Sequence, residues 1–201
     1  MRGDRCPRCA LAAHGGGARC RAPHGAPARS WAPLAHAGPA AALVHALKHR
    51  GALRAADAMA AAIVANAPPG LLAHGAVLVP VPGDPLRRRI RGHDHALRLA
   101  RAIGARTGLP VRACLRRPRP AAAQVGASRS ARLTHGRIAV VARGAPPGDR
   151  LVLVDDVQTT GATLAACAEA LRRSVDRPER RHLGAVTYGR ALSGLRAGRS
   201  L

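Results

Sequence analysis

The fold is decided by one stretch of sequence, Leu151-Val-Leu-Val-Asp-Asp-Val-Gln-Thr-Thr-Gly-Ala-Thr163. Its first four residues predict a buried strand, because a continuous apolar run suits a parallel strand that is covered on both faces. A turn of small and hydroxyl-bearing residues follows, and a helix is expected to begin near Ala162. This strand–turn–helix order indicates an α/β fold.

The same stretch carries the candidate site. Asp155 and Asp156, called the acid pair below, are expected where the strand emerges, at the edge where open α/β sheets bind ligands. Five residues then offer hydroxyl and backbone N–H groups to a phosphate at a helix N-terminus: Thr159, Thr160, Gly161, Ala162 and Thr163. Carboxylates beside a phosphate cradle predict a site for a phosphorylated ribose. The alternative is a solvated acid pair ahead of an ordinary helix, although adjacent carboxylates are rare in a chain with ten acidic residues.

Further elements alternate along the chain. Helices are expected over 40–65, with a break near Gly51, and over 95–107 and 162–173. Strands are expected at 77–82, 138–142 and 183–188, with a short one at 111–115. A basic loop is expected at 87–92 and a long polar loop at 116–136. Alternating strands and helices predict a mostly parallel sheet with helices on both faces.

Composition limits the function. The 201 residues carry a net charge of +23, and Lys48 is the single lysine among 33 basic residues. This charge predicts salt-sensitive attraction to polyanions such as nucleic acids. Trp31 and Tyr188 are the only aromatic residues, so bases have no aromatic stacking platform. A nucleotide hydrolase is excluded, because the motif G-x-x-x-x-G-K-[ST] is absent.

Cysteine and histidine spacing near the start of the chain predicts a structural Zn²⁺ site. Cys6, Cys9, Cys20 and His24 form the pattern C-x₂-C-x₁₀-C-x₃-H, and a Cys₃His set holds Zn²⁺ in a closed tetrahedral site. His14 competes with His24 for the fourth position, and loss of the metal is the alternative. The five cysteines are an odd number, which favours a reducing cytoplasm over a disulfide framework. Cys114 and Cys167 lie in apolar patterns and are expected to be small core residues.

Neither a membrane helix nor a signal peptide is expected. The sequence has no run of 18 apolar residues, and its first residues lack an apolar segment. No membrane insertion and a cytoplasmic location are therefore expected.

The acid pair and the turn after it resemble the 5-phosphoribosyl-1-diphosphate (PRPP) signature of type I phosphoribosyltransferases. From Cys6 to about Tyr188 the chain also resembles the ComF family, phosphoribosyltransferase-like proteins with an N-terminal zinc motif. That wider resemblance rests on several further matches: Lys48 with the following Gly51, the Val-Pro-Val-Pro run 79–82, Arg91-Gly92, Leu115-Arg116-Arg117, Gln124 and, less closely, Arg132.

The resemblance implies a type I phosphoribosyltransferase-like sheet over residues 38–192 and a zinc-ribbon-like segment over 1–37. The sequence itself predicts a frayed tail over 193–201. It also implies that the acid pair contacts the ribose hydroxyls or Mg²⁺ and that residues 159–163 bind the 5′-phosphate. Candidates for the pyrophosphate and its loop are Arg91, Lys48, Arg116 and Gln124.

Two regions depart from the family pattern. His93-Asp94-His95 replaces the usual Phe-Asn-Gln, and His135 replaces an asparagine. Thr159 stands where many purine-type enzymes have a third carboxylate that serves as the base. The sequence therefore specifies PRPP binding better than it specifies catalysis.

Three functions remain open. The ComF resemblance implies a role in DNA uptake and natural transformation, with single-stranded DNA and proteins of the uptake machinery as partners. A metabolic phosphoribosyltransferase of base salvage is the second. The third is a basic, zinc-bearing nucleic-acid-binding protein with a vestigial pocket.

Overall fold

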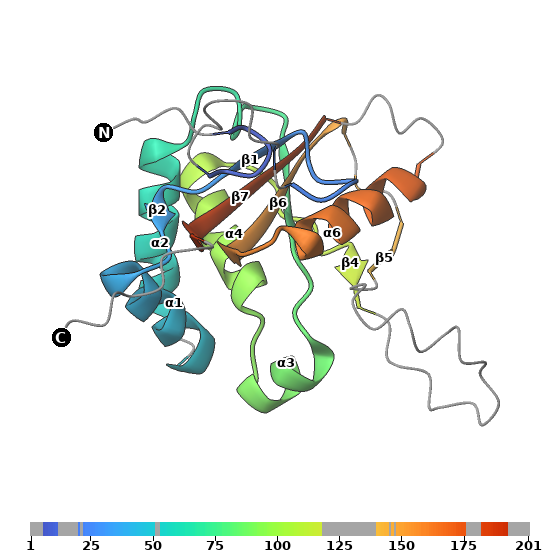
Figure 1. The fold of residues 1–201 in the computed structure, drawn as a ribbon. Coiled ribbons are helices and arrows are strands. Elements are labelled where there is room, and N and C mark those ends of the chain that lie inside the picture. Colours follow the sequence, from blue (N-terminus) through green and yellow to red (C-terminus); the bar gives the residue numbers. More distant parts are fainter. Residues whose placement is uncertain are drawn as a thin grey trace.

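The computed structural model describes residues 6–11, 20, 22–50, 53–117, 140–144, 146, 148–175 and 182–192. Its centre is a parallel sheet in the order β1-β7-β6-β3, in which β2 also pairs with β7 (Figure 1). The strands are β1 (Arg29–Trp31), β2 (Leu34–Ala35), β3 (Val77–Pro80), β6 (Arg150–Gln158) and β7 (His182–Arg190).

Helices cover both faces of this sheet, as the alternation of strands and helices predicted. On one face lie α1 (Gly38–Arg50), α2 (Leu53–Asn66) and α4 (His95–Thr107). The other face is covered by α6 (Ala162–Arg173) and by an antiparallel ribbon of β4 (Leu115–Arg116) and β5 (Val141–Ala142). Figure 1 shows α2 and α6 on opposite sides of β6 and β7.

The side chains of β6 alternate between the two cores. Val152 and Val154 pack among the helices of the first face, whereas Leu151 and Leu153 pack against α6. This alternation follows from the pleat of a strand. Its continuation directs Asp156 toward the α1 and α4 face and Asp155 toward the α6 face.

β6 is longer than the apolar run alone indicates. It pairs with β7 from Arg150 as far as Gln158, so the acid pair lies inside the strand, near its carboxyl end, and not after it. Backbone hydrogen bonds to β7 extend the strand beyond its apolar residues, and a hydrophobic pattern does not predict such bonds. The carboxylates are therefore held by a regular strand.

Helices α4 and α6 have the predicted bounds, and local signals explain the ends of α4. The carboxylate of Asp94 accepts a hydrogen bond from the Leu97 N–H at 3.1 Å, which caps the first turn. Gly108 ends the helix in the left-handed conformation, at φ 71°.

Two local predictions were wrong or incomplete. The basic loop expected at 87–92 is part of a helix, α3 (Pro85–Arg91). Proline is favoured in the first turn of a helix and arginine is a good helix former, so the charge run did not prevent helix formation. Of the strand expected at 111–115, Val111 forms an isolated bridge to Leu78, and β4 begins only at Leu115.

Both β1 and β2 come from the segment 1–37, and their partner is β7 of the main sheet. The boundary at residue 37 stays a prediction. Gln124, Arg132 and His135 lie outside the described residues, as do His14 and the tail 193–201.

Candidate functional site

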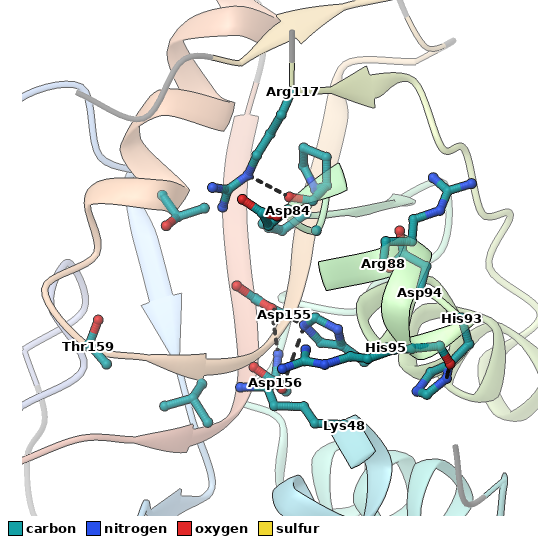
Figure 2. A pocket seen from close by; sticks show the side chains of 16 residues that line it. Lys48, Asp84, Arg88, His93, Asp94, His95, Arg117, Asp155, Asp156 and Thr159 are labelled. Carbon is teal, nitrogen blue, oxygen red and sulfur yellow. Dashed lines mark hydrogen bonds and ion pairs between the residues drawn. The ribbon is translucent and has the colours of Figure 1, made fainter. Parts of the chain in front are cut away.

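A cavity of about 490 Å³ opens where the chain leaves β3 and β6 (Figure 2). This main cavity lies at the carboxyl ends of two parallel strands, the position that open α/β sheets use for ligands. Its polar lining includes Lys48, Asp84, Arg88, Arg91, His93, Asp94, His95, Arg117, Asp155, Asp156, Thr159 and Thr163. The structure thus brings the acid pair, two residues of the turn and several cations to one cavity.

The acid pair meets two nitrogen-bearing side chains from two helices. Lys48 of α1 places its Nζ 2.8 Å from Asp156 Oδ2. His95, the first residue of α4, places its Nε2 3.7 Å from Asp156 Oδ2 and 3.9 Å from Asp155 Oδ1. Figure 2 shows both side chains directed at the carboxylates. In the described part of the chain, Lys48 is the one lysine or arginine within ion-pair distance of the acid pair.

Burial shapes the titration of these groups. The Asp156 side chain is 4% exposed and that of Asp155 is 16% exposed. Burial, and next the repulsion from Asp156, raise the pKa of Asp155 to about 8. Burial lowers the pKa of His95, against the attraction of Asp156. Burial and the repulsion between the two carboxylates therefore both favour a proton on Asp155, while Asp156 is paired with Lys48.

The turn after β6 is shaped by Gly161. This residue has φ 84° and precedes the first turn of α6, and a Cβ there would lie 3.3 Å from Gln158 Nε2 and 3.4 Å from Pro23 Cδ. A side chain would therefore strain both the backbone and the packing. Thr159 and Thr163 line the cavity, while the Thr160 hydroxyl accepts a hydrogen bond from the Ala162 N–H at 3.3 Å. The first N–H groups of α6 face outward at this end, as they do at any helix N-terminus.

Arginines also supply positive charge to the lining of the main cavity. Arg91, singled out from the sequence, lines it together with Arg88 and Arg117. Arg117 is held by a 3.0 Å hydrogen bond from its Nε to the Pro82 carbonyl. Arg116 instead lines a neighbouring cavity of about 740 Å³, called the second cavity. The sequence analysis proposed Arg116 for the pyrophosphate, but its neighbour Arg117 is the one that lines the main cavity. Adjacent residues of an extended chain point to opposite sides, so only one of the two can face a given cavity from a regular strand.

The altered triplet after Arg91-Gly92 has three distinct positions. The ring nitrogens of His93 lie 2.8 Å from the Arg91 carbonyl oxygen and 2.9 Å from the Leu47 carbonyl oxygen, which links α3 to the last turns of α1. Asp94 caps α4, and His95 faces the acid pair. Sequence reasoning noticed this departure but assigned no role to His95.

The three N-terminal cysteines converge. Ligand atoms of Cys6, Cys9 and Cys20, called the cysteine cluster, lie within 4.8 Å of one another, and the Cys6 and Cys20 sulfur atoms are 3.6 Å apart. Thiolates bound at 2.3 Å to one tetrahedral ion lie about 3.8 Å apart, so this spacing fits Zn²⁺. Burial opposes ionisation of Cys6, but hydrogen bonds from the Cys9 and Arg8 backbone outweigh it and lower its pKa to about 6. Such a thiol is ready to bind metal at neutral pH.

His24 does not join the cysteine cluster. It lies exposed in a turn, next to the Pro23 that packs against Gly161. Cys167 is a fully buried residue of α6, and Cys114 packs against the same core.

Arg190 connects the cysteine cluster to the turn, a role that nothing in the sequence pattern indicated. It is 2% exposed at the end of β7, and its Nε donates to the Cys9 carbonyl at 2.7 Å. Its Nη1 donates to the carbonyl oxygens of Gln158 and Thr159. One buried guanidinium thus ties three separate backbone segments together.

A parallel sheet that ends in an acid pair and a hydroxyl-rich turn is the arrangement of a phosphoribosyltransferase-like protein. No family model matches the chain. Over 74 residues it is 36% identical to a hypoxanthine/guanine phosphoribosyltransferase of Methanosarcina acetivorans and 35% identical to one of Methanosarcina mazei. Each match covers 37% of this chain and 38% of the relative, so the chain spans well under half of their length. A phosphoribosyltransferase-like relationship is supported over that part.

Among the described residues, no helix has the length and apolar character needed to cross a membrane.

Proposed function

We propose that this protein binds PRPP, with Mg²⁺, in the main cavity. One observation carries the proposal: carboxylates, a hydroxyl-rich turn at a helix N-terminus and three arginines line the same cavity of about 490 Å³. That volume suits a small phosphorylated ligand. Each of the three chemical parts of PRPP meets a group of opposite or complementary character.

The two phosphate ends have different partners. Thr159–Thr163 offer hydroxyl and N–H groups to the 5′-phosphate at the start of α6. Arg88, Arg91 and Arg117 face the pyrophosphate, where arginine forks form strong paired hydrogen bonds with phosphate oxygens. The roles of Lys48, Arg116 and Gln124 at the pyrophosphate stay predictions, and Lys48 here binds Asp156.

The ribose belongs between these ends, with its hydroxyls at Asp155 and Asp156. These oxygen ligands also fit Mg²⁺, which prefers carboxylate and phosphate oxygens. When bound with PRPP, Mg²⁺ neutralises charge on the leaving pyrophosphate. The chain contributes binding and orientation, because Thr159 occupies the place of a motif-borne base.

A role like that of the ComF family, with single-stranded DNA as a partner, is the first form of this proposal. It is supported by the cysteine cluster and by the second cavity, which Arg88, Arg89, Arg116, Arg117 and Arg143 line. These arginines offer phosphate contacts without aromatic stacking. DNA uptake, partner proteins of that process and a cytoplasmic location are part of this proposal.

Base salvage is the second form, and one observation favours it: both relatives bear the name hypoxanthine/guanine phosphoribosyltransferase. A nucleic-acid-binding protein with a vestigial pocket is the third possibility. It would keep the arginine-lined second cavity and bind no PRPP.

Calorimetric titration with PRPP and Mg²⁺ tests the proposal. Replacing both Asp155 and Asp156 with asparagine should weaken PRPP binding at least about tenfold, or roughly 1.4 kcal/mol, because contacts to the ribose hydroxyls or the ion are lost. Asp57→Asn, which alters an exposed carboxylate of α2, is the matched control. Equal PRPP affinity for the double variant and the parent protein contradicts the assigned ribose site.

Two further experiments distinguish the DNA-linked role from base salvage. Titration in the presence of single-stranded DNA measures whether the two ligands affect each other. A transfer assay with hypoxanthine or guanine reports base salvage through release of pyrophosphate. Absence of PRPP binding under all conditions favours the vestigial pocket.

For the N-terminal segment we propose a structural Zn²⁺ held by Cys6, Cys9 and Cys20. The sequence offers His24 and His14 as the fourth ligand. The 3.6 Å sulfur separation supports the ion itself. His24 lies outside the cysteine cluster in this structure, so binding by His24 would require its turn to move.

A further inference from the structure

His95 joins the acid pair in a group of three potential metal ligands. Its Nε2 and one oxygen from each carboxylate lie within 4.8 Å of one another. The histidine is the first residue of α4, whose first turn is capped by Asp94, and the aspartates belong to β6. A helix and a strand therefore fix the positions of the three side chains. Figure 2 shows the three side chains converging at one end of the main cavity.

The separations suit direct coordination of one ion. Ligand atoms held about 2.1 Å from an ion lie between about 3.0 and 4.2 Å apart, depending on the angle between them. The measured distances from His95 Nε2 are 3.7 Å to Asp156 Oδ2 and 3.9 Å to Asp155 Oδ1. Both lie inside that range, and the carboxylate oxygens of the acid pair lie within 4.8 Å of each other, so side-chain rotation can bring all three atoms around one ion.

The acid pair also has oxygen atoms available for a cation. The acid pair offers two carboxylates, and Lys48 is the one lysine or arginine of the described residues that reaches them. Asp156 Oδ2 is fully buried and receives no hydrogen bond of good geometry from the described residues, although Lys48 Nζ lies 2.8 Å away. A carboxylate oxygen has two lone pairs, so the lysine and an ion can share this atom.

The imidazole of His95 determines which kind of ion the site prefers. Mg²⁺ demands oxygen ligands and keeps much of its water, whereas imidazole nitrogen suits first-row transition ions. We propose that His95, Asp155 and Asp156 form a binding site for a divalent transition ion such as Mn²⁺, which occupies the main cavity before any phosphorylated ligand enters. The site does not depend on PRPP binding, because all three ligands belong to the chain. If PRPP does bind, the ion lies beside the ribose hydroxyls.

Mn²⁺ alone is the probe, followed by electron paramagnetic resonance and calorimetry on the full chain without PRPP. Mn²⁺ also avoids the cysteine cluster, since thiolates select softer ions. The protein should bind one Mn²⁺ more tightly than Mg²⁺, and His95→Gln should weaken Mn²⁺ binding at least about tenfold. Asp156→Asn is the second variant and should give a similar loss, with folding of each variant confirmed by circular dichroism.

Two controls locate the ion. His74→Gln removes an exposed histidine in a turn and His45→Gln removes an exposed histidine of α1, and neither residue lines the main cavity, so both variants should bind Mn²⁺ like the parent protein. The proposal is overturned if His95→Gln binds Mn²⁺ as tightly as the parent, or if the parent prefers Mg²⁺. Because PRPP is absent, this result is independent of the PRPP titration, and each proposal can fail without the other.

Discussion

Replacement of Asp155 by asparagine should stabilise the protein at neutral pH. Burial, then repulsion by Asp156, raises the pKa of Asp155 from 3.8 to about 8. At pH 7 the folded protein therefore keeps a proton on this carboxyl, whereas the unfolded chain has released it. Asparagine has no proton to lose and retains an oxygen that can accept the 2.9 Å hydrogen bond from the Asp156 N–H.

The magnitude follows from proton linkage. Between about pH 4 and pH 8 the folded state binds one more proton than the unfolded state, so the free energy of unfolding falls by about 1.4 kcal/mol per pH unit through this group. Roughly three pH units separate the ordinary pKa from pH 7, so the loss accumulated at neutrality is on the order of 4 kcal/mol. Above pH 8 both states are ionised and the loss stops growing.

Urea denaturation of the parent protein and Asp155→Asn at pH 5, 6, 7, 8 and 9 measures this effect. The difference in unfolding free energy should widen up to about pH 8 and then level off. Asp57→Asn is again the matched control, because it removes one exposed carboxylate of α2 that does not line the main cavity. A difference that stays constant from pH 5 to pH 8 would show that Asp155 carries no proton in the folded state and refute the reasoning.

Three more results are expected. Cys9→Ser should release one equivalent of Zn²⁺ in metal analysis and disorder the N-terminal segment, since metal binding supplies its ordering free energy; protein isolated without chelators and free of zinc speaks against this site. Gly104→Ala should lower the unfolding free energy measured in urea by about 1–3 kcal/mol, because its Cβ would lie 2.9 Å from the Leu109 carbonyl oxygen; an unchanged midpoint would mean that the loop after α4 yields. Single-stranded DNA should bind with an affinity that falls log-linearly with salt and depends little on sequence, given a net charge of +23 and two aromatic residues; binding that persists at high salt contradicts a phosphate-based contact.

The fold could be predicted where local signals and burial agreed. The apolar run 151–154 indicated a central strand, and the small residues before Ala162 indicated the start of α6. Asp94 and Gly108 are strong cap residues, which is why the bounds of α4 follow from the sequence. The prediction of a loop at 87–92 was wrong, because charged residues indicate that a segment is exposed and do not indicate whether it is helical.

The site was only partly predictable, for a different reason. The acid pair and the turn are contiguous in sequence, so a motif can identify them. Lys48 and His95 are 47 residues apart in the sequence and belong to different helices. Their meeting at the acid pair depends on how α1 and α4 pack on the sheet. A sequence pattern does not encode that packing. The sequence showed that His95 departs from the family pattern, but it did not show that His95 contacts Asp155 and Asp156.

Arg190 shows why the N-terminal segment matters to the rest of the site. A buried guanidinium is stable only when its donors are satisfied, and the partners here are carbonyl oxygens of Cys9, Gln158 and Thr159. The cysteine cluster and the turn at the start of α6 therefore share one set of hydrogen bonds. Pro23 adds a second contact by packing against Gly161. Movement of the cysteine cluster must displace Arg190 or leave buried donors unpaired, so order in the N-terminal segment and the shape of the turn are physically coupled.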